Sequence, residues 1–247
     1  MKPCASRPIP EEPEVLEELE PFMPEKGQSG AIIGVSQNGK SHLAMLWMAA
    51  LLAMGFDVVG WDPCWQLGRL NKRREGQEPG PLEHTVIAGD LDADHFRVKQ
   101  LSLAVRPADI YADRDVIARE FVQFAQLCIR ALTAVGRPRR VALFVDECHL
   151  LVDHGPAVRL LEDMAERWGK EGVVPFFVTQ RWSHLSVNVR AEVAWLISFL
   201  QTKRSDLQNL GLDAGKDFAR AVARLKPREY RATCLRVTNK DALALLD

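Results

Sequence analysis

An α/β fold with a central, mostly parallel sheet flanked by helices is the architecture that this sequence predicts. Short apolar segments recur along the chain without internal polar alternation, which is typical of strands buried on both faces. Segments with apolar residues at helical spacing lie between them. Strands that alternate with helices form parallel sheets, and two polar motifs directly follow such strands.

Apolar runs bounded by glycine, proline or polar residues predict the strands. They cover residues 31–34, 56–61, 85–88, 101–105, 141–145, 173–178, 195–200 and 230–237. Steps of three and four between apolar residues predict the helices. One helix begins at residue 40, and others cover about 113–135, 156–168 and 183–193. More than one helix is predicted within about 205–225.

The chain has 247 residues, enough for one sizeable α/β domain. Residues 28–247 are expected to form that domain. Residues 1–27 are rich in proline and glutamate and are expected to form an arm, either packed on a neighbouring subunit or mobile. The net charge of −1 excludes a free-standing basic domain but leaves room for a local basic stripe that binds nucleic acid.

Cysteine usage and hydropathy bear on location. The five cysteines contain no CxxC pair, which disfavours a zinc site and suits a reducing compartment. No apolar run approaches the roughly 18 residues that span a bilayer, and the N-terminus does not resemble a signal sequence. We therefore expect an intracellular, cytoplasmic protein without a membrane span.

The first motif, GVSQNGKS at 34–41, matches G-x-x-x-x-G-K-[ST] in full and lies between a predicted strand and a predicted helix. In such a loop, successive N–H groups and the N-terminus of the helix bind phosphates. Gly39 lets the backbone approach closely, Lys40 would reach the β- and γ-phosphates, and Ser41 would offer its hydroxyl to Mg²⁺. The motif predicts binding of ATP with Mg²⁺. The expected nucleotide contacts are Gly34, Val35, Ser36, Gln37, Asn38, Gly39, Lys40, Ser41 and His42.

The second motif is an apolar strand, 141–145, that ends in two adjacent carboxylates, Asp146 and Glu147. At the carboxyl edge of a parallel sheet such groups lie beside the phosphate loop. Asp146 is expected to hold Mg²⁺, and Glu147 to polarise the water that attacks the γ-phosphate. The alternative is that both merely cap the next element. Together the two motifs predict ATP hydrolysis.

A third apolar strand ends in the polar segment 178–181, VTQR. Gln180 could sense the γ-phosphate or position the attacking water, unless the segment only starts the next helix. Phosphoryl transfer also benefits from an arginine supplied by a neighbouring subunit. Arg181, Arg190 and Arg204 are candidates, each with a surface or ion-pair role as the alternative, and Arg204 is our assignment.

These features together resemble the HerA/FtsK superfamily of DNA-pumping ATPases, and in size the compact packaging ATPases of tailless, membrane-containing viruses. The resemblance rests on the phosphate loop, the Asp62-Pro63 pair after the second strand, the strand ending in Asp-Glu and the Thr-Gln-Arg strand end. The stretch up to 204–211 also resembles the FtsK tail, so the likeness spans roughly 28–236.

The resemblance implies a RecA-like P-loop NTPase of the additional-strand type with a catalytic glutamate. It further implies a homo-hexameric or pentameric ring, ATP hydrolysis at subunit interfaces and translocation of double-stranded DNA. It assigns the roles argued above to Lys40, Ser41, Asp146, Glu147 and Gln180.

The chain departs from that family in two respects. Phosphate loops of the family often carry a further glycine where Gln37 stands, and Asn38, which tolerates left-handed backbone angles, is expected to compensate in part. No winged-helix domain or membrane anchor is found in the sequence. That favours a minimal motor over a chromosome-segregation pump.

The leading hypothesis is therefore an ATP-driven double-stranded DNA translocase that packages a viral genome into a preformed capsid. Its expected partners are capsid or portal-vertex proteins, in the host cytoplasm or the virion. The segment 66–83, with Lys72-Arg73-Arg74, is expected to contact DNA. The alternative is a nucleotide-switched assembly or loader ATPase that does not act on DNA. A metabolic kinase would need an arginine-rich lid, a pattern that we do not find.

Overall fold

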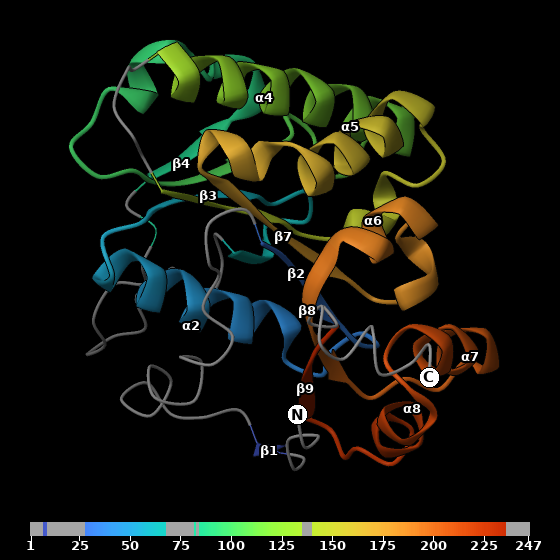
Figure 1. Ribbon diagram of the computed structural model, residues 1–247. Coiled ribbons are helices and arrows are strands. Elements are labelled where there is room, and N and C mark those ends of the chain that lie inside the picture. The colour runs from blue at the N-terminus through green and yellow to red at the C-terminus, as the bar shows by residue number, and fades with distance from the viewer. Residues whose placement is uncertain (1–6, 9–27, 68–81, 83, 135–139, 236–247) are drawn as a thin grey trace, which may run out of the picture.

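The computed structural model describes residues 7–8, 28–67, 82, 84–134 and 140–235. They form a nine-stranded sheet with helices on both faces (Figure 1). The strands are β1 (Arg7–Pro8), β2 (Ser29–Ile33), β3 (Asp57–Trp61), β4 (His84–Ile87), β5 (Ser102–Arg106), β6 (Val141–Val145), β7 (Val173–Thr179), β8 (Val193–Phe199) and β9 (Glu229–Cys234).

Six α-helices and five 3₁₀ turns connect these strands within the described residues. The helices are α2 (Lys40–Ala53), α4 (Arg114–Ala134), α5 (Gly155–Glu166), α6 (Val187–Glu192), α7 (Arg204–Asp213) and α8 (Lys216–Val222). The 3₁₀ turns are η2 (Ala88–Asp90), η3 (Ala93–Phe96), η4 (Cys148–Leu150), η5 (Trp168–Glu171) and η6 (Trp182–His184). No helix in the described part of the chain is both long and apolar enough to cross a bilayer.

The strand order is β1-β9-β8-β2-β7-β6-β3-β5-β4. Every pair from β8 to β4 is parallel, whereas β9 pairs antiparallel with β8, and β1 antiparallel with β9. Strand β7 lies between β2, which precedes the phosphate loop, and β6, which precedes the two carboxylates. The prediction of a mostly parallel, RecA-like sheet with an additional central strand is confirmed.

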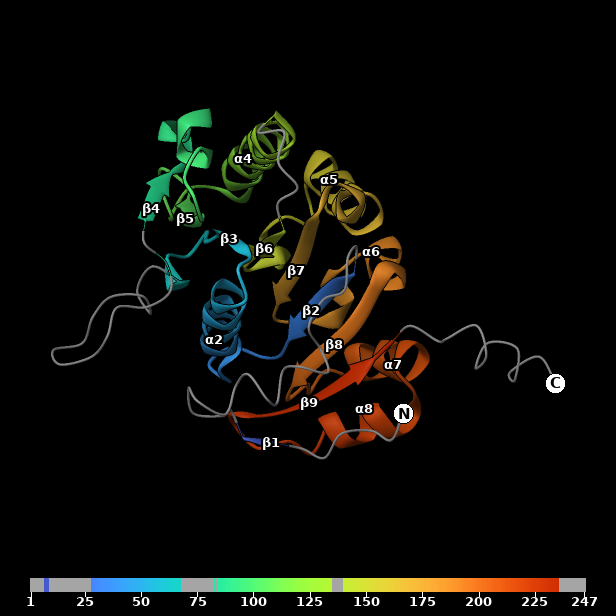
Figure 2. The same cartoon turned by 60° about the vertical axis from the view of Figure 1, so that its left-hand side comes forward.

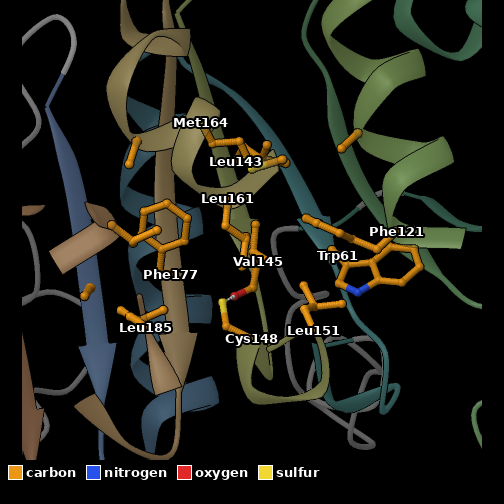
Figure 3. Packing of buried hydrophobic residues seen from close by; sticks show 14 of the residues in the cluster. Trp61, Phe121, Leu143, Val145, Cys148, Leu151, Leu161, Met164, Phe177 and Leu185 are labelled. Atoms are coloured by element: carbon orange, nitrogen blue, oxygen red, sulfur yellow. Dashed lines mark hydrogen bonds between the residues drawn. The ribbon is translucent and has the colours of Figure 1, made fainter. Parts of the chain in front are cut away.

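The sheet separates two apolar layers. Helix α2 covers one face, while α4, α5 and α6 cover the other, with α7 and α8 beside β8 and β9 (Figure 2). Alternate residues of β6 serve the two layers: Leu143 and Val145 face α4 and α5, and Phe144 faces α2. Figure 3 shows the layer under α4 and α5, where Trp61 packs near Phe121.

An aromatic cluster holds α2 on its face of the sheet. Trp47 of α2 lies 4.5 Å from Trp195 and 5.4 Å from Phe176, measured between ring centroids. The Trp195 ring lies over Gly30 of β2, where an added Cβ would come within 1.7 Å of a ring atom. A glycine at residue 30 is therefore what lets this ring lie against β2, and so fixes the start of the phosphate loop relative to α2.

Most predicted elements agree with the structure, and the differences lie near the C-terminal end. The predicted helix 183–193 is instead the turn η6 followed by α6, because the Ser186 hydroxyl caps α6 by accepting from the Val189 N–H. Within the predicted helices of 205–225, the division falls at Gly215, whose φ of 92° is left-handed. Helices α7 and α8 therefore fold back on each other as a short pair.

Parts of three predictions lie outside the described residues. Of the expected arm, the structure describes Arg7–Pro8, which pair with Tyr230 and Glu229 of the same chain. Of the segment 66–83, it describes Gln66, Leu67 and Leu82, so the basic run at 72–74 lies outside. The end of the last predicted strand, 236–237, lies outside as well.

Candidate active site

The carboxyl ends of four adjacent strands bring the predicted site residues together. The phosphate loop follows β2, Asp146 and Glu147 follow β6, Gln180 follows β7, and Asp62 follows β3. Because neighbouring parallel strands end at the same edge, residues far apart in sequence meet there. The site therefore depends on the strand order as much as on the motifs.

The start of the phosphate loop is hydrogen-bonded to the ends of two neighbouring strands, β7 and β8. The Gly34 N–H donates to the Thr179 carbonyl at 3.3 Å, and the Val35 N–H donates to the Leu200 carbonyl at 3.2 Å. An added Cβ on Gly34 would lie 2.5 Å from Cβ of Phe199, so a larger residue would displace the loop. Gly39 precedes α2 with φ of 99°, a conformation that glycine adopts without steric cost.

The loop corrects one expectation from the sequence. Gln37, not Asn38, adopts the left-handed conformation, with φ of 64°. The side chain of Asn38 is buried instead and donates from Nδ2 to the Val35 carbonyl at 3.4 Å. Asn38 thus braces the loop from inside, while Gln37 takes the backbone position at which family loops often carry glycine. Ser36, Gln37 and His42 are exposed around this core.

Lys40 lies buried beneath the loop. Its Nζ donates to the Val35 carbonyl at 3.3 Å. Burial lowers the pKa of Lys40, while the carboxylates of Glu147 and Asp146 act in the opposite direction. A buried ammonium at the start of a helix, within the phosphate loop, suits the binding of a polyanion.

Asp146 has the features of a cation ligand. Its Oδ1 accepts from the Glu147 N–H at 2.9 Å, whereas its Oδ2 is buried without a hydrogen-bond partner. Burial, and then the charges of Glu147 and Asp62, raise the pKa of Asp146 to about 8. An unsatisfied carboxylate oxygen in a dry site is costly unless a further group binds it.

The donor set at this edge fits Mg²⁺. Mg²⁺ is usually held through one or two carboxylates together with substrate phosphates, rather than by a protein cage. Within the described ranges no group of three or more His, Cys, Asp or Glu could hold a metal by itself. The Ser41 hydroxyl and the Asp146 Oδ2 are the two oxygen ligands that the chain would contribute.

Glu147 is held on both carboxylate oxygens. Its Oε1 accepts from Gln66 Nε2 at 3.3 Å, and its Oε2 accepts from Gln180 Nε2 at 3.4 Å. His149 Nδ1 lies 3.0 Å from the same Oε2. Burial acts to raise the pKa of Glu147, but the contact with His149, the charge of Lys40 and the Gln180 amide outweigh it, so that the pKa is lowered. This carboxylate is therefore ionised and oriented.

The three candidate arginines differ in their surroundings. Arg181 Nε donates to Asp206 Oδ2 at 2.8 Å, and Arg190 pairs with Asp213 Oδ2 at 2.7 Å. Both guanidinium groups are thus engaged within their own chain. Arg204, the first residue of α7, is exposed.

Two residues of the site have no motif that would have revealed them. Gln66 contacts both Ser41 and Glu147, and its only indication in the sequence is its place shortly after a strand end. His149 follows the acid pair in the sequence without belonging to a motif, and its neighbour Cys148 is buried and donates to the Val145 carbonyl (Figure 3). His149 instead serves the Glu147 carboxylate.

Comparison with known proteins extends this description. No family model matches the chain, and no curated protein matches it significantly. The genome packaging NTPase B204 of Sulfolobus turreted icosahedral virus 2, in complex with AMPPCP, is similar in structure with a TM-score of 0.62 at 14% identity, over 88% of this chain and 95% of that chain.

Two further structures are similar over comparable lengths. B204, the DNA-packaging ATPase of Sulfolobus turreted icosahedral virus, has a TM-score of 0.57 at 17% identity, over 87% of this chain and 94% of that one. VirB4 of Thermoanaerobacter pseudethanolicus has a TM-score of 0.62 at 10% identity, over 87% of this chain and 90% of that chain. At these identities the likeness concerns architecture, and the chain has the RecA-like P-loop NTPase fold that the packaging NTPase B204 and VirB4 share.

Proposed function

We propose that this chain hydrolyses ATP at the carboxyl edge of its sheet and uses the energy to move double-stranded DNA. The observation that carries the hydrolytic part is the Glu147 carboxylate. It is ionised, held on both oxygens, and adjoins a buried lysine and a buried aspartate. This arrangement suits a general base beside bound phosphates.

Each residue has a distinct part in the proposed reaction. The loop N–H groups and Lys40 bind and orient the β- and γ-phosphates. Ser41 and Asp146 would hold Mg²⁺, which supplies charge neutralisation on the phosphate oxygens. Glu147 orients the attacking water and receives its proton, and Gln180 fixes the second oxygen of that carboxylate. These steps are positioning and electrostatics, the main means by which phosphoryl transfer is accelerated.

The proposal that the chain moves DNA is supported by its structural similarity to B204. The fold and size resemble B204, which is described as a genome packaging NTPase and a DNA-packaging ATPase. By analogy we propose packaging of a viral genome into a preformed capsid by a ring of five or six copies, with capsid or portal-vertex partners in the host cytoplasm. Within that ring Arg204 is our candidate for the arginine supplied in trans, because Arg181 and Arg190 are paired internally. The basic run at 72–74 stays our prediction for DNA contact.

The test is the steady-state ATPase rate with and without double-stranded DNA, on material whose assembly state is known from light scattering. We expect several-fold stimulation by DNA that weakens steeply as salt rises. The Glu147→Gln variant should bind ATP but turn over at least about 100-fold more slowly. Glu166→Gln, an exposed change at the end of α5, is the matched control and should resemble wild type.

Three outcomes would count against the proposal. Turnover that ignores DNA in a verified ring would reject the translocase. An unchanged rate in Glu147→Gln would reject the assignment of the base. A slow, DNA-independent rate in a monomer would favour the nucleotide-switched loader.

A further inference from the structure

The side chain of Gln66 joins two groups of the site that have different tasks. Ser41 Oγ donates to Gln66 Oε1 at 2.9 Å, and Gln66 Nε2 donates to Glu147 Oε1 at 3.3 Å. A carboxylate can only accept hydrogen bonds, so the amide NH₂ must face Glu147, which leaves the amide oxygen for the hydroxyl. One amide therefore connects the proposed metal ligand to the proposed base.

The turn that carries Gln66 is held in place by its backbone. The Gln66 N–H donates to Asp62 Oδ1 at 2.6 Å, and Asp62 is fully buried. Trp65 lies in the left-handed region with φ of 52°, an uncommon conformation for a bulky residue, and the Arg106 guanidinium lies over its ring. Leu67, directly after Gln66, is fully buried. Such strain persists where the surroundings over-determine a conformation, and it concentrates at functional sites.

The conformation of this turn does not depend on the side-chain amide of Gln66. The turn is closed by the Gln66 N–H, by Asp62 and by the burial of Leu67, none of which needs the amide of the side chain. The side-chain amide instead hydrogen-bonds to Ser41 and Glu147. A substitution at residue 66 can therefore remove the link and leave the turn closed.

We propose that Gln66 is a positioning residue that couples the metal-binding hydroxyl of Ser41 to the orientation of Glu147. The inference rests on the proposed ATPase function and deepens it. A hydroxyl that coordinates a cation through an oxygen lone pair must direct its O–H elsewhere, and Gln66 Oε1 accepts the hydrogen bond from it. Partners behind the direct ligands commonly orient them in this way. Because the same amide also donates to Glu147, the orientation of the Glu147 carboxylate depends on whether Ser41 binds the cation.

The coupling predicts different effects for two substitutions. Gln66→Leu removes both contacts, so the half-saturating Mg²⁺ concentration should rise about tenfold and kcat should fall about tenfold, the range typical of lost partners behind a metal ligand. Gln66→Glu keeps an acceptor for Ser41 but loses the donor to Glu147. In that variant the half-saturating Mg²⁺ concentration should not rise, while kcat should fall at least as far as in Gln66→Leu.

The experiment measures binding of a fluorescent, slowly hydrolysed ATP analogue over a Mg²⁺ titration and in EDTA, together with the ATPase rate. Affinity in EDTA should be the same in wild type and both variants, because Gln66 contacts no phosphate-binding group of the loop besides Ser41. Gln100→Leu is the matched control, since that glutamine also donates from Nε2, to the Leu52 and Phe56 carbonyls away from the site. It should leave both the Mg²⁺ dependence and kcat as in wild type. Thermal unfolding confirms that each variant is folded.

Two results would overturn the inference. One is an unchanged Mg²⁺ dependence and kcat in Gln66→Leu. The other is an equal loss of affinity with Mg²⁺ and in EDTA in both variants, which would mean that Gln66 only shapes the pocket. If wild type proves not to hydrolyse ATP, the proposed function fails, yet the Mg²⁺ dependence of analogue binding still decides whether Gln66 serves Ser41.

Discussion

Asp146 and Glu147 are neighbours in the chain, yet their surroundings move their pKa values in opposite directions. Burial and two nearby carboxylates raise the pKa of Asp146 to about 8. The pKa of Glu147 is lowered, because the effects of His149, Lys40 and Gln180 together outweigh the effect of its burial. Such divergence between adjacent acids separates their roles. In the proposed reaction, Asp146 would bind a cation that favours its ionised form, and Glu147 would act as the base.

The raised pKa of Asp146 predicts a pH-dependent stability change in Asp146→Asn. Below pH 3.8 this carboxyl is protonated in both folded and unfolded chains, whereas between pH 3.8 and about 8 only the unfolded chain ionises, which favours unfolding. Asparagine removes that penalty and keeps an acceptor for the Glu147 N–H. In EDTA at pH 8 the variant should therefore be more stable by roughly 2 kcal/mol or more, since one pKa unit corresponds to about 1.4 kcal/mol.

Chemical denaturation in EDTA from pH 5 to 8.5 measures this effect. The gain over wild type should shrink as the pH falls, and addition of Mg²⁺ with ATP should stabilise wild type more than the variant, which lacks the proposed carboxylate ligand. Asp90→Asn, an exposed change, should show neither trend. A constant difference across the pH range would argue against the raised pKa.

At the scale of elements, the sequence predicts the strands well and the site only in part. Apolar runs such as 141–145 coincide with observed strands because each strand is buried on both faces and tolerates no polar alternation. The late start of α6 depends on the side-chain cap by Ser186, which apolar spacing does not record. Gln66 and His149 reach Glu147 through the strand order and through turn geometry, so no local pattern predicts them.

The packing of β2 against the Trp195 ring predicts that Gly30→Ala destabilises the protein. The added Cβ would lie 1.7–2.2 Å from three atoms of that ring. The ring would have to move within a cluster that includes Trp47 and Phe176. Overpacking of this kind typically costs about 1–3 kcal/mol. Urea unfolding should show a lower midpoint with an unchanged slope.

A second glycine serves as the control for that change. Gly89→Ala introduces the same methyl group where no atom lies within 4 Å, and it should leave the urea midpoint close to that of wild type. If Gly30→Ala were equally mild, the Trp195 ring would have to be free to move. The aromatic cluster would then not fix α2 on the sheet.

At the scale of the whole molecule, the described chain supplies the phosphate loop, the acid pair and Gln180, but its arginines at 181 and 190 are paired internally. The fold thus leaves the exposed Arg204 as the candidate that a neighbouring copy could present. A head-to-tail ring places one surface of each copy against a different surface of the next. In the proposed ring, one copy would contribute Glu147 and its neighbour Arg204 to each site.

Mixing two inactive variants tests that arrangement. Arg204→Ala should lose about 10³-fold or more in kcat, the range for a missing arginine in trans, and Glu147→Gln should be inactive because it lacks the proposed base. In rings assembled from equal amounts, about a quarter of the interfaces would pair an intact Glu147 with an intact Arg204, so activity should partly return. Mixing Glu147→Gln with Lys40→Ala is the control, because both changes affect the same copy's half of the site and no interface is repaired. Recovery in the first mixture alone would place Arg204 in its neighbour's site, and recovery in neither would remove it from the mechanism.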